Sequence, residues 1–535
     1  MTSTEGATRA ATPASTPSDT PSETADRRQS AANQTPAPDD QPKRRHQSAT
    51  AGAHTYNASS RRNVTAAAVV SDEDAPHDAT HDGIDALAVS DANPDGAYGE
   101  DHNGADVDAD ETATVSSDGL ALRLPTIQDI WRAHDVIRPH VYHTPLLPSK
   151  TIGALCGATV YLKAENLQRS GAYKIRGATY KLSRLTPDER ARGVIAASAG
   201  NHAQGVAIAA RALGIACTIV MPTAAPLAKV TATQGYGAQV VLFGDTYNDA
   251  YAHARALQTE TGATYIHAYD DPDIIAGQGT LGLEILTDLP EVEVIVVGLG
   301  GGGLISGIAT AVKALKPDVR IIGVEAAGAA SMRAALDAGG IVELTAINTI
   351  ADGIATKSAG AYTYAITREL VDEVVTVSDE EIISAVLLLL ERCKQLVEGA
   401  GAVCVAALLS GRVDVAGKQV VAVLSGGNID MNLVGRFIQH GLATQGRYLT
   451  LHTLLADRPG ELLRLLSVIA SQNVNVLDVE HHRSAPRLPI QQVEVTLTLE
   501  TRDRAHCEAL VALLRERAFT VTEARPIFAP SASDA

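Results

Sequence analysis

The sequence predicts an α/β fold: a domain built on a mainly parallel sheet, followed by a smaller unit of the βαββαβ type. From residue 122 to about residue 445, short β-branched apolar runs alternate with helical runs rich in Ala. This rhythm is typical of crossover connections between parallel strands. The candidate strands are almost unbroken apolar runs, as expected when helices cover both faces of a sheet. After residue 447 the rhythm changes to alternating strands and two amphipathic helices.

The first 121 residues differ in composition from the rest of the chain. Residues 1–120 hold 8 Lys and Arg against 21 Asp and Glu, so they carry −13 of the chain's net charge of −18. Between residues 72 and 118 there are 15 acidic residues and no Lys or Arg. A segment this polar, with Tyr56 and Tyr98 as its only aromatic residues, buries too little apolar surface to offset the entropy of ordering. We therefore expect residues 1–121 to form a disordered acidic extension.

Residues 122–445 are expected to form the larger domain. A helical pattern covers Ile127–Ile137, and the prolines at 145 and 148 break it. The strands expected after it are Thr159–Lys163, Val194–Ser198, Ala216–Met221, Gln239–Phe243, Val292–Val297, Arg320–Val324 and Gln419–Leu424. Between them, helices are expected at His202–Leu213, Tyr247–Thr261 and Ser306–Leu315. In such folds, ligands bind at the carboxyl ends of the strands.

Residues 447–530 are expected to form a separate domain. The strand Tyr448–Leu455 leads through a turn into the helix Glu461–Gln472, which has its leucines on one face. The elements expected after it are the strands Val474–Glu480 and Gln491–Leu499, the helix Arg504–Arg517 and the strand Thr520–Arg525. Roughly 80 residues in this order are enough for an independent two-layer unit.

Lys174 is the first candidate for chemistry. It lies among small residues in Ser-Gly-Ala-Tyr-Lys-Ile-Arg-Gly-Ala (residues 170–178), where a strand pattern gives way to a helix. Lysine is the side chain that forms a Schiff base with an aldehyde cofactor and can afterwards act as a base on the substrate. Alone, the segment is also compatible with an ordinary solvated helix start.

A glycine-rich loop follows the strand Val292–Val297 and precedes a helix. Its four consecutive glycines are Gly300, Gly301, Gly302 and Gly303. Without Cβ atoms, backbone amides can approach a phosphate closely, and the helix dipole adds to the attraction. Because the loop also contains the G-x-G-x-x-G spacing, a dinucleotide site is the competing interpretation.

Two further polar segments follow strands. The first consists of Ser198, Ala199, Gly200, Asn201 and His202. Its amides and hydroxyl can accept a substrate carboxylate, and the Asn201 amide can donate to a phenolate oxygen; simple N-capping is the alternative. The second begins at Ser425, whose hydroxyl can hydrogen-bond a pyridine nitrogen without holding it protonated, a setting that favours β-elimination. A turn serine is the alternative there. Together with Lys174, these groups predict pyridoxal 5′-phosphate as the cofactor.

With these segments in this order, the chain resembles the threonine ammonia-lyase (threonine dehydratase) family of fold-type-II pyridoxal-phosphate enzymes. The resemblance covers about residues 122–442 and rests on the lysine segment, on Ser-Ala-Gly-Asn-His-Ala-Gln-Gly, on the four glycines and on Ser-Gly-Gly-Asn. It implies a fold like that of tryptophan synthase β, with two open parallel-sheet subdomains. It also implies conversion of L-threonine to 2-oxobutanoate and ammonia, and of L-serine to pyruvate.

The resemblance assigns roles to single residues. It makes Lys174 the Schiff-base lysine, places the phosphate on Gly300–Gly303, and sets Asn201 against the ring hydroxyl and Ser425 against the ring nitrogen. Glu398 matches a family glutamate near the cofactor, with a helix-end glutamate as the alternative. Serine racemases carry a second serine where this chain has Ala199, so racemisation is expected to be poor. Their cation site begins at the position of Glu325, but the aspartate expected six residues later is Ser331 here, so no metal is expected.

The residues from Tyr448 onward resemble a single ACT domain. Such domains bind a regulatory amino acid, often isoleucine or valine, and pair by joining their sheets. A homodimer or homotetramer with an amino-acid effector is therefore expected. The candidate effector residues are Asp457, Arg458, Pro459, Gly460, Asn473 and Asn475.

Composition argues against several other classes of protein. Five cysteines without zinc spacing indicate a reduced, cytoplasmic protein. The apolar runs are too short to span a membrane, and no basic patch suggests nucleic acid. Two alternatives remain: a dehydratase or racemase of the same fold acting chiefly on serine, and a non-catalytic amino-acid sensor. The presence of Lys174 argues against the sensor.

Overall fold

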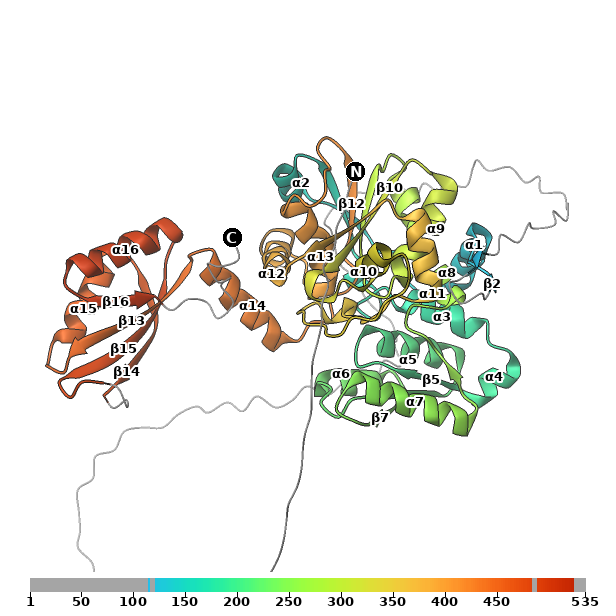
Figure 1. Ribbon diagram of the computed structural model, residues 1–535, viewed down its shortest axis with the longest axis horizontal. Coiled ribbons are helices and arrows are strands. Elements are labelled where there is room, and N and C mark those ends of the chain that lie inside the picture. The colour runs from blue at the N-terminus through green and yellow to red at the C-terminus, as the bar shows by residue number, and fades with distance from the viewer. Residues whose placement is uncertain (1–113, 116–120, 484–487, 524–535) are drawn as a thin grey trace, which may run out of the picture. The chain divides into compact units, whose positions relative to one another are not determined.

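The computed structural model describes residues 114–115, 121–483 and 488–523 (Figure 1). The expected disordered extension lies outside the described residues, except that Thr114–Val115 (β1) pairs with Ala121–Leu122 (β2). The last part of the expected C-terminal domain, residues 524–530, also lies outside them. No helix in the described ranges is long and apolar enough to cross a membrane.

A six-stranded sheet forms the centre of what we call the six-stranded subdomain. Its order is β11-β10-β9-β12-β4-β3, and all neighbours are parallel except β3, which runs antiparallel at the edge. The strands are β3 Leu146–Pro148, β4 Thr159–Lys163, β9 Val294–Gly298, β10 Arg320–Ala326, β11 Glu373–Val377 and β12 Gln419–Val423. Every residue of β9 is buried, as expected for a central strand covered on both faces.

A second sheet forms the four-stranded subdomain. Its order is β7-β6-β5-β8, and all its neighbours are parallel. The strands are β5 Val194–Ala197, β6 Cys217–Met221, β7 Gln239–Leu242 and β8 Thr264–Tyr265. The expectation of two parallel-sheet subdomains is confirmed, and Figure 1 shows α5, α6 and α7 around the second sheet.

Four helices of the two subdomains begin at a capping box. Thr126, Thr186, Thr246 and Ser378 each form a capping box with an acidic residue three positions later. The helices are α1 Ile127–Ile137, α2 Lys150–Cys156, α3 Ile175–Ser183, α4 Pro187–Arg192, α5 Asn201–Leu213, α6 Leu227–Gly235, α7 Tyr247–Thr261, α8 Pro272–Asp288, α9 Gly303–Leu315, α10 Ser331–Ala338, α11 Ala361–Leu370, α12 Asp379–Leu388, α13 Gly399–Leu409 and α14 Met431–Thr444. Short helical turns are η1 Glu165–Leu167, η2 Ala327–Ala329, η3 Asp352–Ile354 and the π-helical η4 Leu389–Cys393.

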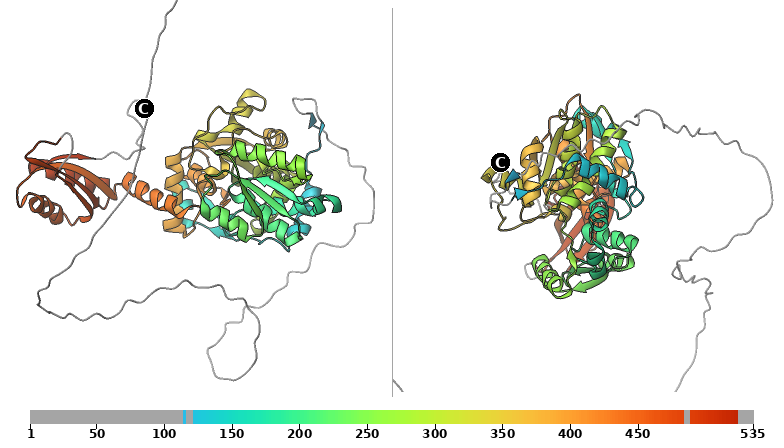
Figure 2. Two further views of the ribbon diagram at one scale, coloured as in Figure 1. Left: turned by 90° about the horizontal axis from the view of Figure 1, so that it is seen from below. Right: turned by 90° about the vertical axis from the view of Figure 1, so that its right-hand side faces the viewer.

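The C-terminal part is an antiparallel sheet of order β14-β15-β13-β16 with two helices. Its elements are β13 Tyr448–Ala456, α15 Glu461–Ser471, β14 Asn475–His482, β15 Gln492–Glu500, α16 Arg504–Glu516 and β16 Thr520–Glu523. Buried apolar residues of both helices and of the sheet form one cluster, and Figure 2 shows the two helices on one side of the sheet. The predicted βαββαβ order is confirmed, and the arrangement is compatible with an ACT-like domain.

Two differences from the expected elements affect the site. Helix α9 begins at Gly303 and not at Ser306, and β9 extends to Gly298. The loop between them is therefore only residues 299–302, so all its amides lie at the end of a strand and the start of a helix.

Candidate active site

The Lys174 segment and the Ser425 segment lie side by side. Ala172 forms an isolated antiparallel bridge with Gly426. On either side of it, the Tyr173 N–H donates to the Ser425 carbonyl at 3.1 Å and the Gly427 N–H donates to the Gly171 carbonyl at 2.8 Å. Two segments about 250 positions apart in the sequence are thus joined by backbone hydrogen bonds.

Lys174 immediately precedes α3, and its ammonium is held by a backbone group. Nζ donates to the Ala268 carbonyl at 2.9 Å, in the loop between β8 and α8. No carboxylate of the described residues forms an ion pair with it, and Nζ lies 5.2 Å from the centre of the Tyr173 ring. This amine is available for covalent chemistry.

Asn201 connects the two subdomains. Its Nδ2 donates to Oε1 of Glu398 at 2.7 Å, and its Oδ1 accepts from Nδ2 of Asn428 at 2.8 Å. Asn428 also donates to the Ser170 carbonyl at 2.7 Å. Helix α5 begins after Gly200 without a side-chain cap, so Asn201 is not the N-cap that the alternative interpretation required.

Glu398 is buried beside this network. It lies directly before α13, but its carboxylate makes no capping bond and turns to Asn201. Oε1 fits closely between two glycines, because a methyl group at Gly426 would stand 2.6 Å from it and one at Gly353 would stand 3.1 Å from it. Burial, and then the charge of Asp352, raise the pKa of Glu398 to about 7, against the lowering effects of Asn201, Lys229 and Lys174. The carboxyl group can therefore exchange a proton near neutral pH.

The four glycines form a buried cradle with free donors. None of the N–H groups of Gly300, Gly301, Gly302 and Gly303 donates to another described residue, whereas the preceding Leu299 N–H is bonded to the Val324 carbonyl. Gly302 has a φ of 92°, a conformation that a residue with a Cβ rarely adopts. Buried amides without partners are costly, so this array, at the start of the 13-residue α9, is built to receive an anion.

Tyr269 covers the glycine cradle, and sequence reasoning did not predict it. Its ring lies against Gly301, and its hydroxyl donates to the Ser358 carbonyl at 3.3 Å. Burial raises the pKa of Tyr269 to about 12, so the phenol stays protonated at neutral pH. The only local signal is the following Asp-Asp-Pro, which marks the start of α8.

The remaining residues of the Ser198–His202 segment have separate surroundings. Ser198 Oγ accepts from the Gly200 N–H at 3.2 Å, which closes a tight turn before α5. The ring of His202 is buried and donates to the Ile266 carbonyl at 3.0 Å. Burial lowers the pKa of His202 to about 3, so the ring is neutral and serves packing. Ala199 offers a methyl group and no proton.

Ser425 is 5% exposed at the end of β12. Its Oγ lies 3.4 Å from the Ala400 carbonyl, a long hydrogen bond that leaves the hydroxyl free to turn to another acceptor. The position is therefore compatible with a ring nitrogen as partner, as the resemblance implies.

A buried ion network supports the helix that follows Lys174. The guanidinium of Arg176 is fully buried and donates to both oxygens of Glu165 and of Glu284, at 2.6–3.0 Å. These two carboxylates raise the pKa of Arg176, so it stays charged despite its burial. Lys163 joins the network through Glu284 and Asp288 at 2.9 Å. The network fixes the start of α3, and hence the position of Lys174.

Glu325 has a structural partner of its own. Its two oxygens accept the N–H groups of Met332 and Arg333, each at 2.8 Å, at the start of α10. Ser331, at the position where the cation site would continue, lies 3.2 Å from the Thr356 hydroxyl. Within the ranges that the structure describes, no cluster of three or more His, Cys, Asp or Glu side chains is arranged to hold a metal ion.

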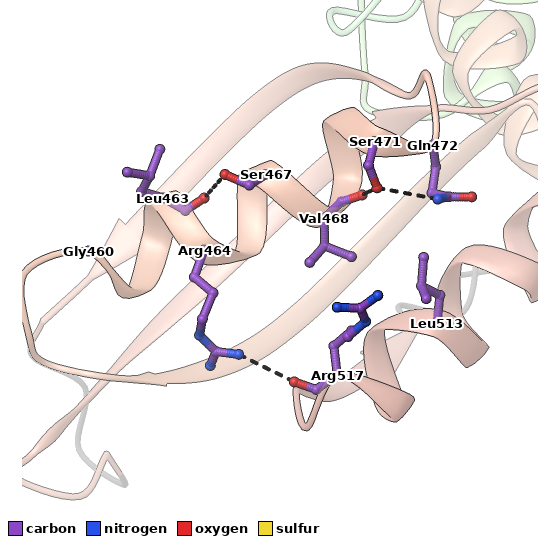
Figure 3. A pocket seen from close by; sticks show the side chains of 9 residues that line it. All are labelled: Gly460, Leu463, Arg464, Ser467, Val468, Ser471, Gln472, Leu513 and Arg517. Atoms are coloured by element: carbon purple, nitrogen blue, oxygen red, sulfur yellow. Dashed lines mark hydrogen bonds between the residues drawn. The ribbon is translucent and has the colours of Figure 1, made fainter.

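The candidate effector residues do not meet within one chain. Asp457, Arg458, Pro459 and Gly460 follow the end of β13, whereas Asn475 pairs with Glu500 at the opposite end of the sheet. Asn473, with a φ of 54°, lies beside Asn475. A groove of about 590 Å³ lies between α15 and α16, and of the candidate residues only Gly460 lines it (Figure 3).

Comparison with known proteins agrees with this geometry. Residues 137–426 match the family model described as pyridoxal-phosphate dependent enzyme. The L-threonine ammonia-lyase of Thermotoga maritima is 48% identical over 396 residues, which cover 74% of this chain and 98% of that relative. The L-threonine ammonia-lyase of Geobacter sulfurreducens is 49% identical over 387 residues, covering 72% and 96%.

Two solved structures of similar enzymes each align with more than half of this chain. The threonine deaminase of T.th. aligns with a TM-score of 0.54 and 44% identity, over 57% of this chain and 99% of that one. A maize serine racemase aligns with a TM-score of 0.57 and 36% identity, over 60% and 98%.

Proposed function

The chain belongs to the family of pyridoxal-phosphate-dependent enzymes and, within it, to the threonine ammonia-lyases, and we propose on this basis that it converts L-threonine to 2-oxobutanoate and ammonia. L-Serine gives pyruvate by the same reaction. The observation that carries the proposal is that the Lys174 segment is hydrogen-bonded to the Ser425 segment, whose Asn428 binds Asn201 of the Asn201–Glu398 pair.

The described residues fit the cofactor. Its phosphate needs several donors, and the buried, unpartnered amides of Gly300–Gly303 supply them. Ser425 would face the ring nitrogen and Asn201 the ring hydroxyl. When bound, the cofactor supplies an aldehyde that takes up an amine and a ring that withdraws electrons from Cα.

Each side chain then has a task in the elimination. Lys174 would hold the cofactor through Nζ, and its amine, when free, would take the Cα proton of the substrate. The Ser198–His202 segment holds the substrate carboxylate with its loop amides. The β-hydroxyl leaves as water, and hydrolysis of the remaining enamine returns that water and releases ammonia, so the reaction balances as threonine to 2-oxobutanoate plus ammonia.

Two features favour elimination over racemisation. The Ser425 hydroxyl can hydrogen-bond a ring nitrogen but cannot hold it protonated, which favours loss of a β-leaving group. Ala199 has no proton to return to the opposite face of Cα. Racemisation of serine is therefore expected to be slow compared with its deamination.

We further propose a regulatory role for residues 447–530, with residues 122–445 as the catalytic domain. The ACT-like order of strands and helices supports binding of an amino-acid effector such as isoleucine or valine, and pairing into a homodimer or homotetramer. Because the candidate residues at the two ends of the sheet do not meet within one chain, a site that uses both groups has to lie between two copies.

The proposal is tested on the purified protein in two ways. Formation of 2-oxobutanoate from threonine and pyruvate from serine is measured with and without each branched-chain amino acid. Borohydride reduction followed by peptide mapping is expected to label Lys174. A label on another lysine, or a strong preference for serine over threonine, contradicts the assignment.

A further inference from the structure

We propose that Lys229 and Asp352 are positioning residues, whose ion pair fastens the four-stranded subdomain to the η3 turn and thereby holds Glu398 and the glycine cradle in place. The proposal deepens the proposed function, because it assigns to two residues outside the segments that carry the resemblance a part in arranging the same site.

The ion pair crosses between the subdomains. Nζ of Lys229, on α6, donates to Oδ2 of Asp352, on η3, at 3.0 Å. Val230 of α6 belongs to the core under the four-stranded sheet, whereas Ala351 and Ile354 belong to that of the six-stranded sheet. Among the ion pairs of the described residues, this is the only one that involves residues 194–265. The side chain of Lys229 is 19% exposed and that of Asp352 is 64% exposed, so water screens the pair mainly from the Asp352 side.

The η3 turn touches two parts of the candidate active site. A methyl group at Gly353 would stand 3.1 Å from Oε1 of Glu398. A methyl group at Gly300 would stand 2.7 Å from Cα of Ile354. The turn therefore lies between the buried carboxyl group of Glu398 and the glycine cradle, and a shift of Asp352 displaces its neighbours on both sides.

The pair also balances charge next to Glu398. The groups that act on this carboxyl are Asp352 on η3, Lys229 on α6, Lys174 before α3 and Asn201 at the start of α5. Burial raises the pKa of Glu398 most, Asp352 raises it further, and Asn201, Lys229 and Lys174 lower it. Without Lys229, the charge of Asp352 acts on Glu398 opposed only by the charge of Lys174. Without Asp352, no negative charge offsets the lowering effect of Lys229 on the pKa of Glu398.

Because the two residues act on Glu398 with opposite sign, their single variants are expected to move the pH profile in opposite directions. In the holoenzyme, Lys229→Met shifts the limb of the kcat/KM profile that reports Glu398 to higher pH, and Asp352→Asn shifts it to lower pH. The double variant returns that limb near the wild-type position, and Lys229→Arg keeps it there. All variants except Lys229→Arg lose about two- to fivefold in kcat/KM, the range of a partly exposed ion pair.

A second measurement is independent of turnover. Hydrogen exchange of the backbone amides of α6 in the holoenzyme is expected to speed up in Lys229→Met and in Asp352→Asn. The matched control is Lys313→Met, which removes a comparable ion pair, Lys313–Asp372 at 2.9 Å, whose two members lie in the six-stranded subdomain. This control is expected to leave both α6 exchange and the pH profile unchanged.

Shifts of the pH profile in the same direction for both single variants, or unchanged α6 exchange in both, overturn the proposal. An equal effect of Lys313→Met overturns it as well, since the cause is then general destabilisation. If the wild-type protein forms no 2-oxobutanoate from threonine, the proposed function fails. The exchange experiment then still decides whether the ion pair fastens the subdomains.

Discussion

Replacing Glu398 by Gln is expected to change how the stability of the cofactor-free protein depends on pH. The glutamine has nearly the same shape and can still accept the Asn201 hydrogen bond, which the structure gives as 2.7 Å. It cannot ionise. Glu398 is 4% exposed, and burial followed by the Asp352 charge raises its pKa from 4.5 to about 7.

The size and sign of the expected change in the free energy of unfolding follow from the raised pKa of Glu398. Because the pKa of Glu398 is higher in the folded than in the unfolded state, ionisation disfavours the folded state. The cost is absent below about pH 4.5, grows as pH rises and is complete above about pH 7. One pKa unit corresponds to about 1.4 kcal/mol, so the full cost is about 3 kcal/mol. About 2 kcal/mol of it falls between pH 5.5 and pH 8.5.

The assay is urea unfolding of both proteins at these two pH values. The wild type is expected to lose about 2 kcal/mol more than Glu398→Gln on going from the lower to the higher pH. Glu369→Gln, at an exposed carboxylate on α11, is the control and should follow the wild type. If wild type and Glu398→Gln change in parallel, Glu398 titrates normally and the account of its burial is wrong.

Three further predictions concern the lysine, its supporting network and the C-terminal domain. Lys174→Ala is expected to abolish 2-oxobutanoate formation while the circular dichroism melting curve stays close to that of the wild type; substantial residual lyase activity contradicts the role of Lys174. Arg176→Met is expected to destabilise the protein by about 3–5 kcal/mol in urea unfolding, because Glu165 and Glu284 lose their buried partner. The exposed Arg184, at the end of the same helix, is the control, and its replacement by Met should cost less than about 0.5 kcal/mol; equal losses rule out a special role for the network. Deleting residues 447–535 is expected to spare turnover and remove the response to isoleucine or valine, so unchanged inhibition in the truncated enzyme places the effector site elsewhere.

The sequence predicts the sheet strands well where they are long and apolar. Thr159–Lys163 matches β4 at both ends, and most of the other predicted strands are off by one or two residues. The strands β3, β8 and β11 were missed for local reasons. β3 contains a proline at a sheet edge, β8 has two residues, and β11 begins with an acidic residue. Their strand character comes from pairing with another strand: β3 with the following β4, β8 with β5, and β11 with β10.

The residues of the candidate site also fall into two groups: those that a short sequence segment predicts, and those that only the fold brings together. Lys174 and the four glycines were predicted because a covalent lysine and a phosphate cradle need particular residue types in one short segment. The contacts of Asn428 with Asn201, of Lys229 with Asp352 and of Tyr269 with Gly301 join residues that the fold brings together. An Asn, a Lys or a Tyr in isolation carries no signal for such a pairing, so sequence reasoning could not find them.

The surroundings of Arg176 limit what an engineer can do with this enzyme. Its guanidinium donates to Thr280 and to the Tyr142 carbonyl as well as to the two glutamates. A lysine has three donors on one atom and cannot reproduce that fork, so even the exchange of one basic residue for another leaves acceptors stranded. Libraries aimed at new substrates should keep position 176 constant and vary residues such as Tyr269, which contacts Gly301, the Ser358 carbonyl and the ring of His267 but forms no ion pair.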